Sequence, residues 1–187
     1  MMPYIQGDPS SVPTAYAPYG DIIESVFLKK GDIGFLTVDD ESLASKGLPH
    51  RGARAKYQRP LHTEAGKIPA MYCWGGDTTW GGKRRVQLDR SVRILLANNL
   101  DDSCAVWDVE HEDTSSDGDI GYAAADYPYT EAALLKSGDV YDIGILTPHE
   151  SIPVQSDFNR QFLRIVSSGV HGREDYFTQN PLVVWKG

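Results

Sequence analysis

The sequence predicts an all-β protein: a single jelly-roll sandwich of eight to nine strands, with one short helix and an extended N-terminal arm. Eleven Pro and 18 Gly among 187 residues are too many for a helical bundle. Short apolar runs are separated by turn residues, which is typical of sandwiches and jelly rolls. A hydrophobic content of 41% and a charged content of 24% indicate a globular chain, and the length suits one domain.

The arm is expected at residues 1–20 and the single jelly-roll domain at residues 21–187. Proline recurs at positions 3, 9, 13 and 18, and this favours an extended, polyproline-like conformation over a helix. Tyrosine offers a large contact area at a low entropic cost. The tyrosines of the arm, Tyr4, Tyr16 and Tyr19, are therefore candidates for contact with a neighbouring chain.

The first two strands are expected at residues 22–28 and 33–38, joined as a hairpin by the turn at residues 29–32. Residues 39–68 are expected to be irregular, because glycine and proline interrupt them. Further strand-like segments follow at 69–74, 85–88, 92–97, 105–110, 140–146, 162–166 and 182–185.

One segment, residues 130–136, has the pattern of a helix. Thr130 is a suitable cap, Glu131 suits the first turn, and Gly138 lies just past the expected end.

Three tryptophans are candidate interface anchors. Trp74 and Trp80 lie in a glycine-rich run, residues 74–82, which lacks the Lys-Ser/Thr ending of a phosphate loop. Trp185 lies in the apolar tail, which must be covered within the subunit or by a neighbour to avoid aggregation. Packing within the subunit is the alternative for these side chains.

The formal net charge of −8 comes from 26 acids, of which 18 are Asp, against 18 bases. Phosphate backbones repel such a chain, so direct nucleic-acid binding is disfavoured. The acids are interpreted as solvated loop tips, or as an adaptation to high salt in a halophilic protein. The basic stretch at residues 50–59 is expected to pair with acids of this chain or a neighbour, or to contact an anionic surface such as lipid headgroups.

No transmembrane segment is expected, because the longest aliphatic stretch is residues 94–97. Residues 1–13 lack the basic region and apolar core of a secretory signal.

Motifs for chemistry are weak, so we expect no enzyme, no catalytic residue and no cofactor. Cys73 and Cys104 lie in apolar contexts and are expected to be buried thiols, although one disulfide is the alternative. A cupin-type metal enzyme needs a His-x-His pair, which is absent; His111 and His149 are the nearest approximation.

One acidic loop, residues 113–119, resembles a cation-binding loop in composition but departs from the EF-hand spacing. Its weak candidate metal ligands are Asp113, Asp117 and Asp119. A solvated loop is the alternative.

One family shares the whole pattern. The length, the start Met2-Pro3-Tyr4-Ile5-Gln6-Gly7-Asp8, the Asp-rich balance and the run of short strands resemble the small major capsid proteins of tailless, internal-membrane icosahedral viruses of haloarchaea and thermophilic bacteria. The resemblance implies a single jelly roll standing upright in the virion capsid. It also implies an oligomer, in which the chain assembles with itself and a larger related capsid protein into capsomers above a membrane. Membrane-associated virion proteins are further possible partners, and the family has no active site.

Two other classes of function remain open. A virus decoration module or a carbohydrate-binding sandwich would use Trp74, Trp80 and Trp107 as anchors or as a sugar platform. A cupin-like metal enzyme is the third class.

Overall fold

A computed structural model describes residues 2–26, 28–48, 59–68, 71–74, 85–86, 92–112, 118–166 and 179–183, with the backbone alone for residues 40–42, 65–68, 71–74 and 85–86. The described chain consists mostly of antiparallel β-sheet with few, short helices. This confirms the all-β class.

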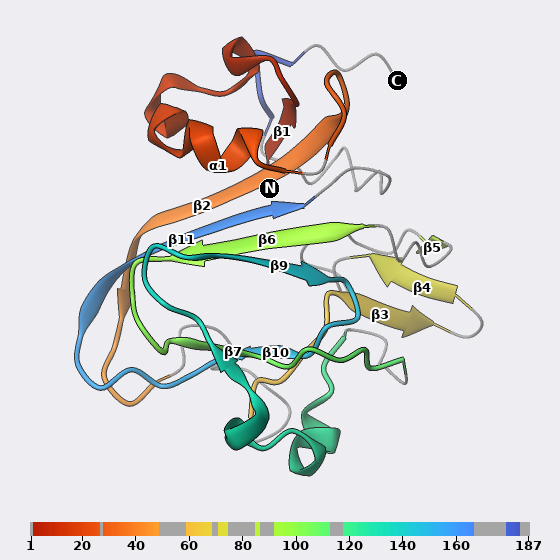
Figure 1. Ribbon diagram of the computed structural model, residues 1–187, viewed down its shortest axis with the longest axis vertical. Helices are drawn as coiled ribbons and strands as arrows, with labels where there is room; N and C mark the ends of the chain where they lie inside the picture. Colours follow the sequence, from red (N-terminus) through yellow and green to blue (C-terminus); the bar gives the residue numbers. More distant parts are fainter. Residues whose placement is uncertain are drawn as a thin grey trace.

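The largest sheet has five antiparallel strands in the order β1-β2-β11-β6-β9 (Figure 1). Their bounds are β1, Met2–Ile5; β2, Ile33–Ala44; β11, Phe158–Val166; β6, Arg93–Asn98; and β9, Val140–Gly144. The strands expected at 33–38, 92–97, 140–146 and 162–166 are therefore present, with β2 and β11 longer than the local pattern indicates.

The second sheet, β10-β7-β8, comprises His149–Ser151, Cys104–Val106 and Ala133–Leu134. His62 extends this sheet, because its backbone forms isolated antiparallel bridges with His149 and with Asp119. A third sheet, β3-β4-β5, contains Ala65–Ile68, Met71–Trp74 and Arg85–Val86, which places strands in the expected 69–74 and 85–88 segments.

The core lies between the first two sheets. Strand β6 directs Ile94 and Leu96 to this core, where they join Cys104 and Val106 of β7. Leu95 of the same strand points to the opposite face and is also buried. A strand buried on both faces reads as a continuous apolar run, which explains the unbroken aliphatic stretch at 94–97.

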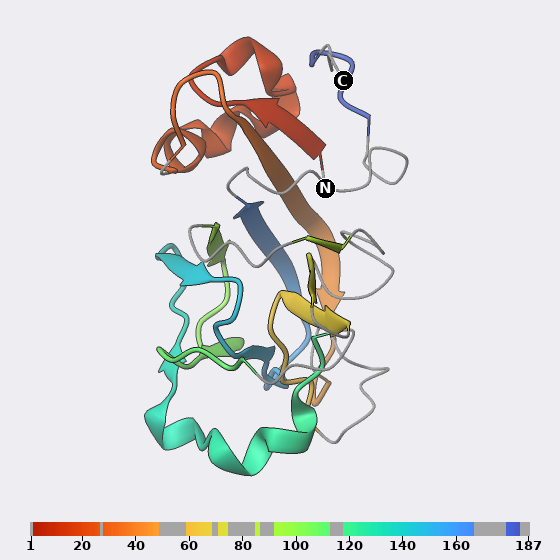
Figure 2. The same cartoon turned by 90° about the vertical axis from the view of Figure 1, so that its right-hand side faces the viewer.

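The outer face of the large sheet is covered by the chain's own N-terminal segment, seen above β2 in Figures 1 and 2. After β1 come the 3-10 helices η1 (Pro9–Ser11) and η2 (Thr14–Tyr19) and the short helix α1 (Gly20–Glu24). The expected extended arm is thus wrong beyond Ile5. A proline in the first position is compatible with a helical turn: Pro9 begins η1, and the Asp8 carboxylate caps η1 by accepting from Ser10 N at 3.0 Å.

Tyr4 is buried inside this N-terminal layer, and its side chain is 0% exposed. Its ring lies against Gly34 of β2, where an added Cβ would come within 2.5 Å of it. Burial raises the pKa of the Tyr4 hydroxyl, and the nearby Glu24 carboxylate adds to the rise. Tyr16 and Tyr19 pack against the same apolar cluster. The interface role expected for Tyr4 is therefore wrong, because its ring contacts its own subunit.

Two local expectations fail. The strand expected at 22–28 is absent from its described residues: residues 22–24 belong to α1 and residues 25, 26 and 28 belong to no strand, so the turn at 29–32 precedes β2 without closing the expected hairpin. Residues 130–136 do not form the expected helix. Thr130 and Glu131 end a short 3-10 helix, η4 (Tyr129–Glu131), Ala132 is extended (φ −83°, ψ 144°), and Ala133–Leu134 pairs with β7 as β8.

The tail returns to the N-terminal layer (Figure 2). Asn180 Nδ2 donates to the carbonyls of Pro3 and Ser11 at 2.8 and 2.7 Å. Residues 182–183 are not a strand; Trp80 and Trp185 lie outside the described residues, and Trp74 is described only as backbone of β4. Among the described residues, no helix is long and apolar enough to cross a membrane.

Candidate functional site

The strongest cluster of chemical groups lies between the two main sheets. His62, Glu64 and His149 each bring one potential ligand atom within 4.8 Å of the others. His62 and His149 exchange two backbone hydrogen bonds of 3.0 Å, so they lie directly opposite each other on neighbouring strands. Directly opposite residues project to the same side. Glu64 follows His62 by two residues and shares that side.

Both imidazole rings are oriented by backbone carbonyls. The His62 Nδ1 lies 2.8 Å from the Pro60 oxygen, and the His149 Nδ1 lies 2.9 Å from the Thr147 oxygen. A carbonyl oxygen only accepts hydrogen bonds, so each Nδ1 carries the hydrogen, and in the neutral ring the lone pair is on Nε2. The His149 Nε2 lies 3.4 Å from Glu64 Oε1, and the two ring centroids are 4.2 Å apart.

A buried ion pair crosses from this cluster to the large sheet. Arg164 of β11 donates from Nη1 to Glu64 Oε1 at 2.6 Å. The side chains of Arg164 and Glu64 are 1% and 11% exposed. Burial by itself raises the pKa of Glu64, but the Arg164 guanidinium and His149 together hold it well below its usual range. Burial lowers the pKa of Arg164, and Glu64 opposes that shift.

The Glu64 pKa predicts how acid destabilises the protein. A carboxylate whose pKa is lowered by folding stabilises the folded state above its unfolded pKa of about 4.3, and the contribution is lost as the pH falls through the folded value. The free energy of unfolding should therefore fall below about pH 4.3, with at most about 1.4 kcal/mol per pH unit from this single group. Urea denaturation at several pH values measures it. In Glu64→Gln this part of the slope should disappear; an unchanged slope would contradict the assignment.

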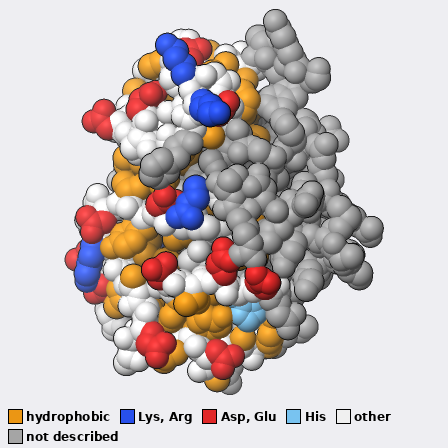
Figure 3. Space-filling view, turned by 45° about the vertical axis from the view of Figure 1, so that its right-hand side comes forward, with side chains coloured by type: hydrophobic (Ala, Val, Ile, Leu, Met, Phe, Trp, Pro, Cys, Tyr) orange, Lys and Arg blue, Asp and Glu red, His pale blue; other side chains and the backbone are white. Residues whose placement is uncertain are grey.

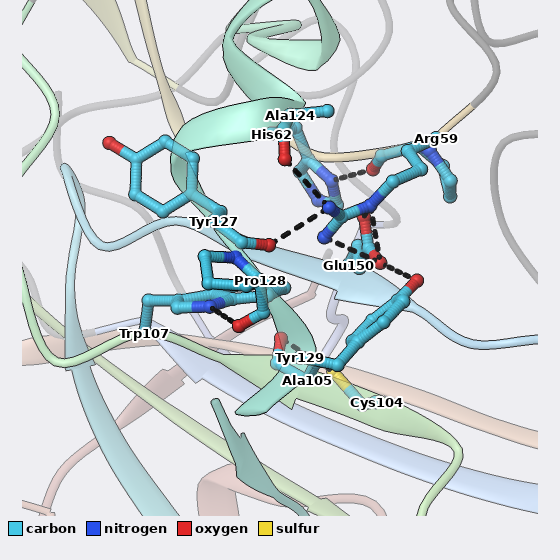
Figure 4. A network of polar contacts seen from close by, with 11 residues as sticks. Arg59, His62, Cys104, Ala105, Trp107, Ala124, Tyr127, Pro128, Tyr129 and Glu150 are labelled. Carbon is cyan, nitrogen blue, oxygen red and sulfur yellow. Dashed lines mark hydrogen bonds and ion pairs between the residues drawn. The ribbon is translucent and has the colours of Figure 1, made fainter. Parts of the chain in front are cut away.

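A second polar network adjoins the first through β10 (Figure 4). The Arg59 Nε donates to both oxygens of Glu150, at 3.2 and 3.1 Å, and its Nη1 donates to the carbonyls of Ala124 and Tyr127. The Tyr129 hydroxyl also donates to Glu150. Burial, together with this hydrogen bond to the Glu150 carboxylate, raises the pKa of Tyr129 to about 12.

Arg59 also lies over aromatic rings, 5.3 Å from the centre of Trp107 and 4.5 Å from that of Tyr129. Glu150 is 0% exposed, so its charge is compensated by a cation and a hydroxyl. The network fixes β10, and with it His149, relative to the 3-10 helices around residues 121–131.

The space beside the cluster is small. A cavity of about 20 Å³ is bounded by residues of both sheets, which is room for one water molecule or one ion. Its lining comprises His62, Glu64, Leu96, Cys104, His149, Glu150, Ser151, Arg160 and Phe162.

Most of the candidate metal ligands predicted from the sequence lie outside this cluster. Asp119 Oδ1 accepts from Gly121 N at 3.0 Å, so it stabilises a turn; Asp113 and Asp117 lie outside the described residues. The His111 ring nitrogens lie 2.7 and 3.1 Å from the hydroxyls of Tyr127 and Tyr122. His111 is not part of the cluster that contains His149, so the two histidines named for the cupin alternative are not brought together.

Cys104 is a buried thiol, as expected, and the side chain of Cys73 is outside the described part. Sequence reasoning missed His62 and Glu64, because they lie in a segment judged irregular. Their two-residue spacing was the available signal, since it places both side chains on one face of an extended chain.

Comparison of the chain with protein-family models, with curated proteins and with solved structures finds no significant match. The functional conclusion therefore depends on the fold and the site of this chain.

Proposed function

We propose that this protein is a structural virion protein, a small major capsid protein of the single-jelly-roll kind. It assembles with copies of itself and a larger related capsid protein into an icosahedral shell over an internal membrane. The observation that carries the proposal is the order of the strands in the two facing sheets.

Four strands of the large sheet lie in the order β2-β11-β6-β9. Across the core, the segment around His62 lies beside β10, followed by β7 and β8. The chain therefore passes back and forth between the two sheets. The first sheet receives β2, β6, β9 and β11, and between them the second sheet receives the His62 segment, the β7-β8 pair and β10. This order supports a jelly roll, in which eight strands form two interlocked Greek keys. Viral capsid proteins, lectins and cupins share this architecture.

Two of the nominated sites favour a building block among these three classes. A substrate needs a pocket of about 300 Å³ or more, whereas the cavity at the His62 cluster measures about 20 Å³; a larger hollow of about 470 Å³, lined by Asp101, Tyr129 and Ile152 among others, lies away from this cluster. Trp107, a candidate for a sugar platform, is 3% exposed and donates its indole N–H to the Pro128 carbonyl. These observations disfavour a cupin-type substrate site at the His62 cluster and a sugar platform at Trp107, and so support a structural role.

The surface supports assembly that depends on salt. Acidic side chains are spread over the face shown in Figure 3 rather than gathered in one patch. Exposed apolar side chains also occur near strand ends, where Leu43 is 58%, Val140 42% and Phe158 37% exposed, and in the loop after β2, where Leu48 is 57% exposed. Copies of a chain with net charge −8 repel each other unless ions screen the charge, over about 3 Å at 1 M salt but about 30 Å at 0.01 M.

The proposal predicts that assemblies dissociate at low ionic strength. Particles prepared with the larger partner in about 1 M salt should lose their light scattering after dialysis to about 0.01 M. Dialysis against sucrose of equal osmolality, in low salt, should give the same loss, because screening and not osmotic pressure holds the subunits together. Particles that remain intact after desalting would count against the proposal.

A further inference from the structure

We infer that His62, Glu64 and His149 bind one divalent transition-metal ion, of which Zn²⁺ fits best. The inference does not depend on the proposed capsid function, because the three ligands belong to one chain.

The distance between two of the three ligand atoms, those of His149 and Glu64, fits a metal. Around a tetrahedral ion with bonds of about 2.0–2.1 Å, neighbouring ligand atoms are roughly 3.3–3.4 Å apart. The His149 Nε2 and Glu64 Oε1 are 3.4 Å apart. When His149 is neutral, its Nδ1–H is hydrogen-bonded to a carbonyl, and its Nε2 lone pair faces a lone pair of Glu64. Either a metal ion or an added proton must lie between them, since bare lone pairs repel.

The surroundings are those of a metal site. Ligating histidines usually donate their other ring N–H to a backbone carbonyl or a carboxylate, and both rings here are held in this way by Pro60 and Thr147. Ligating carboxylates are themselves hydrogen-bonded, and Glu64 accepts from Arg164. Oxygen Oε1 has a second lone pair with which it can bind the ion.

The chemistry of the ligands selects the kind of metal. Two imidazole nitrogens favour zinc and its neighbours over calcium or magnesium, which prefer oxygen. Three protein ligands leave a fourth tetrahedral position, and the adjoining cavity of about 20 Å³ accommodates one water there.

The bound ion would fasten the His62–Glu64 segment to β10, because His62 and Glu64 lie on that segment and His149 lies on β10. The ion pair of Glu64 with Arg164 then connects this site to the large sheet. Because Arg164 already compensates the charge of Glu64, we expect weaker binding than at a site with thiolate ligands.

The test uses the full-length protein without a histidine tag, freed of metal by EDTA and then dialysed. Titration with CoCl₂ should give one visible ligand-field band, saturating at one equivalent, and ZnCl₂ should displace it. Zinc should also raise the thermal midpoint of the wild-type protein, because an ion that binds only the folded state stabilises it.

Three histidine variants make the result specific. His62→Ala and His149→Gln should each weaken Co²⁺ binding by about tenfold or more, whereas His111→Ala, a matched histidine outside the cluster, should bind like wild type. His62 is only partly buried, so His62→Ala should still fold if His149→Gln does not. A wild-type protein without the band or the thermal shift, or binding that survives in His62→Ala, would overturn the inference and leave a protonated His149 as the partner of Glu64.

Discussion

Replacing Arg164 by methionine should cost about 3–5 kcal/mol of the free energy of unfolding, because it leaves the Glu64 carboxylate buried without its cation. The Arg164 side chain is 1% exposed and that of Glu64 11%, so water cannot replace the lost partner. Urea denaturation at neutral pH in the presence of EDTA measures the effect without any contribution from a metal.

Two comparisons separate this loss from a general effect of mutation. The double variant Glu64→Leu with Arg164→Met removes both charges and should recover much of the loss, since paired apolar replacements of buried ion pairs are often neutral. Lys136→Ala removes an exposed ion pair with Asp102 and should hardly shift the midpoint. If Arg164→Met were as mild as Lys136→Ala, the ion pair would not hold the sheets together.

Replacing Tyr4 by alanine should cost about 3–5 kcal/mol, the range for truncating a large buried aromatic side chain. Tyr4 is 0% exposed, fits against Gly34 and donates its hydroxyl to Gln6 Oε1 at 3.1 Å. The truncation should loosen the N-terminal layer, so limited proteolysis should cut within residues 1–26 faster than in wild type.

The matched control is Tyr122→Ala, because Tyr122 is 46% exposed and its truncation should stay within about 0.5 kcal/mol. Equal, small effects of the two variants would mean that the N-terminal segment does not belong on its own sheet. That result would revive its interpretation as an arm that reaches a neighbouring subunit.

The sequence was sufficient where the local pattern and the tertiary environment agree. The apolar run of β6 predicts a strand because both of its faces are buried, at Ile94 and at Leu95. The sequence was insufficient where contacts between distant parts of the chain determine the local structure or the role of a residue. From the sequence alone, Tyr4 has the features of a residue that contacts a neighbouring chain. In the structure its ring packs inside the subunit, because Gly34 has no side chain and leaves space for it.

The helix expected at 130–136 failed for a similar reason. Pairing with β7 gives Ala133 and Leu134 hydrogen-bonded partners from a distant strand, and a short helical pattern carries too little intrinsic stability to compete. Tertiary contacts therefore override the capping signals.

The candidate site was least predictable. His62 and Glu64 lie in a segment interrupted by proline, and their meaning depends on the backbone bridge to His149, far along the chain. Neither a His-x-His pair nor a Cys-x-x-Cys motif marks the cluster in the sequence. Arg164, which compensates Glu64, comes from the opposite sheet, and no local pattern connects the two.

The central claim, that this chain is a building block for a shell, is tested most directly by its mass in solution. Sedimentation in concentrated salt, with rising protein concentration and with the co-expressed larger partner, should show growth from the 20.7 kDa subunit to multiples of it. A subunit that stays at 20.7 kDa under all of these conditions would contradict the account.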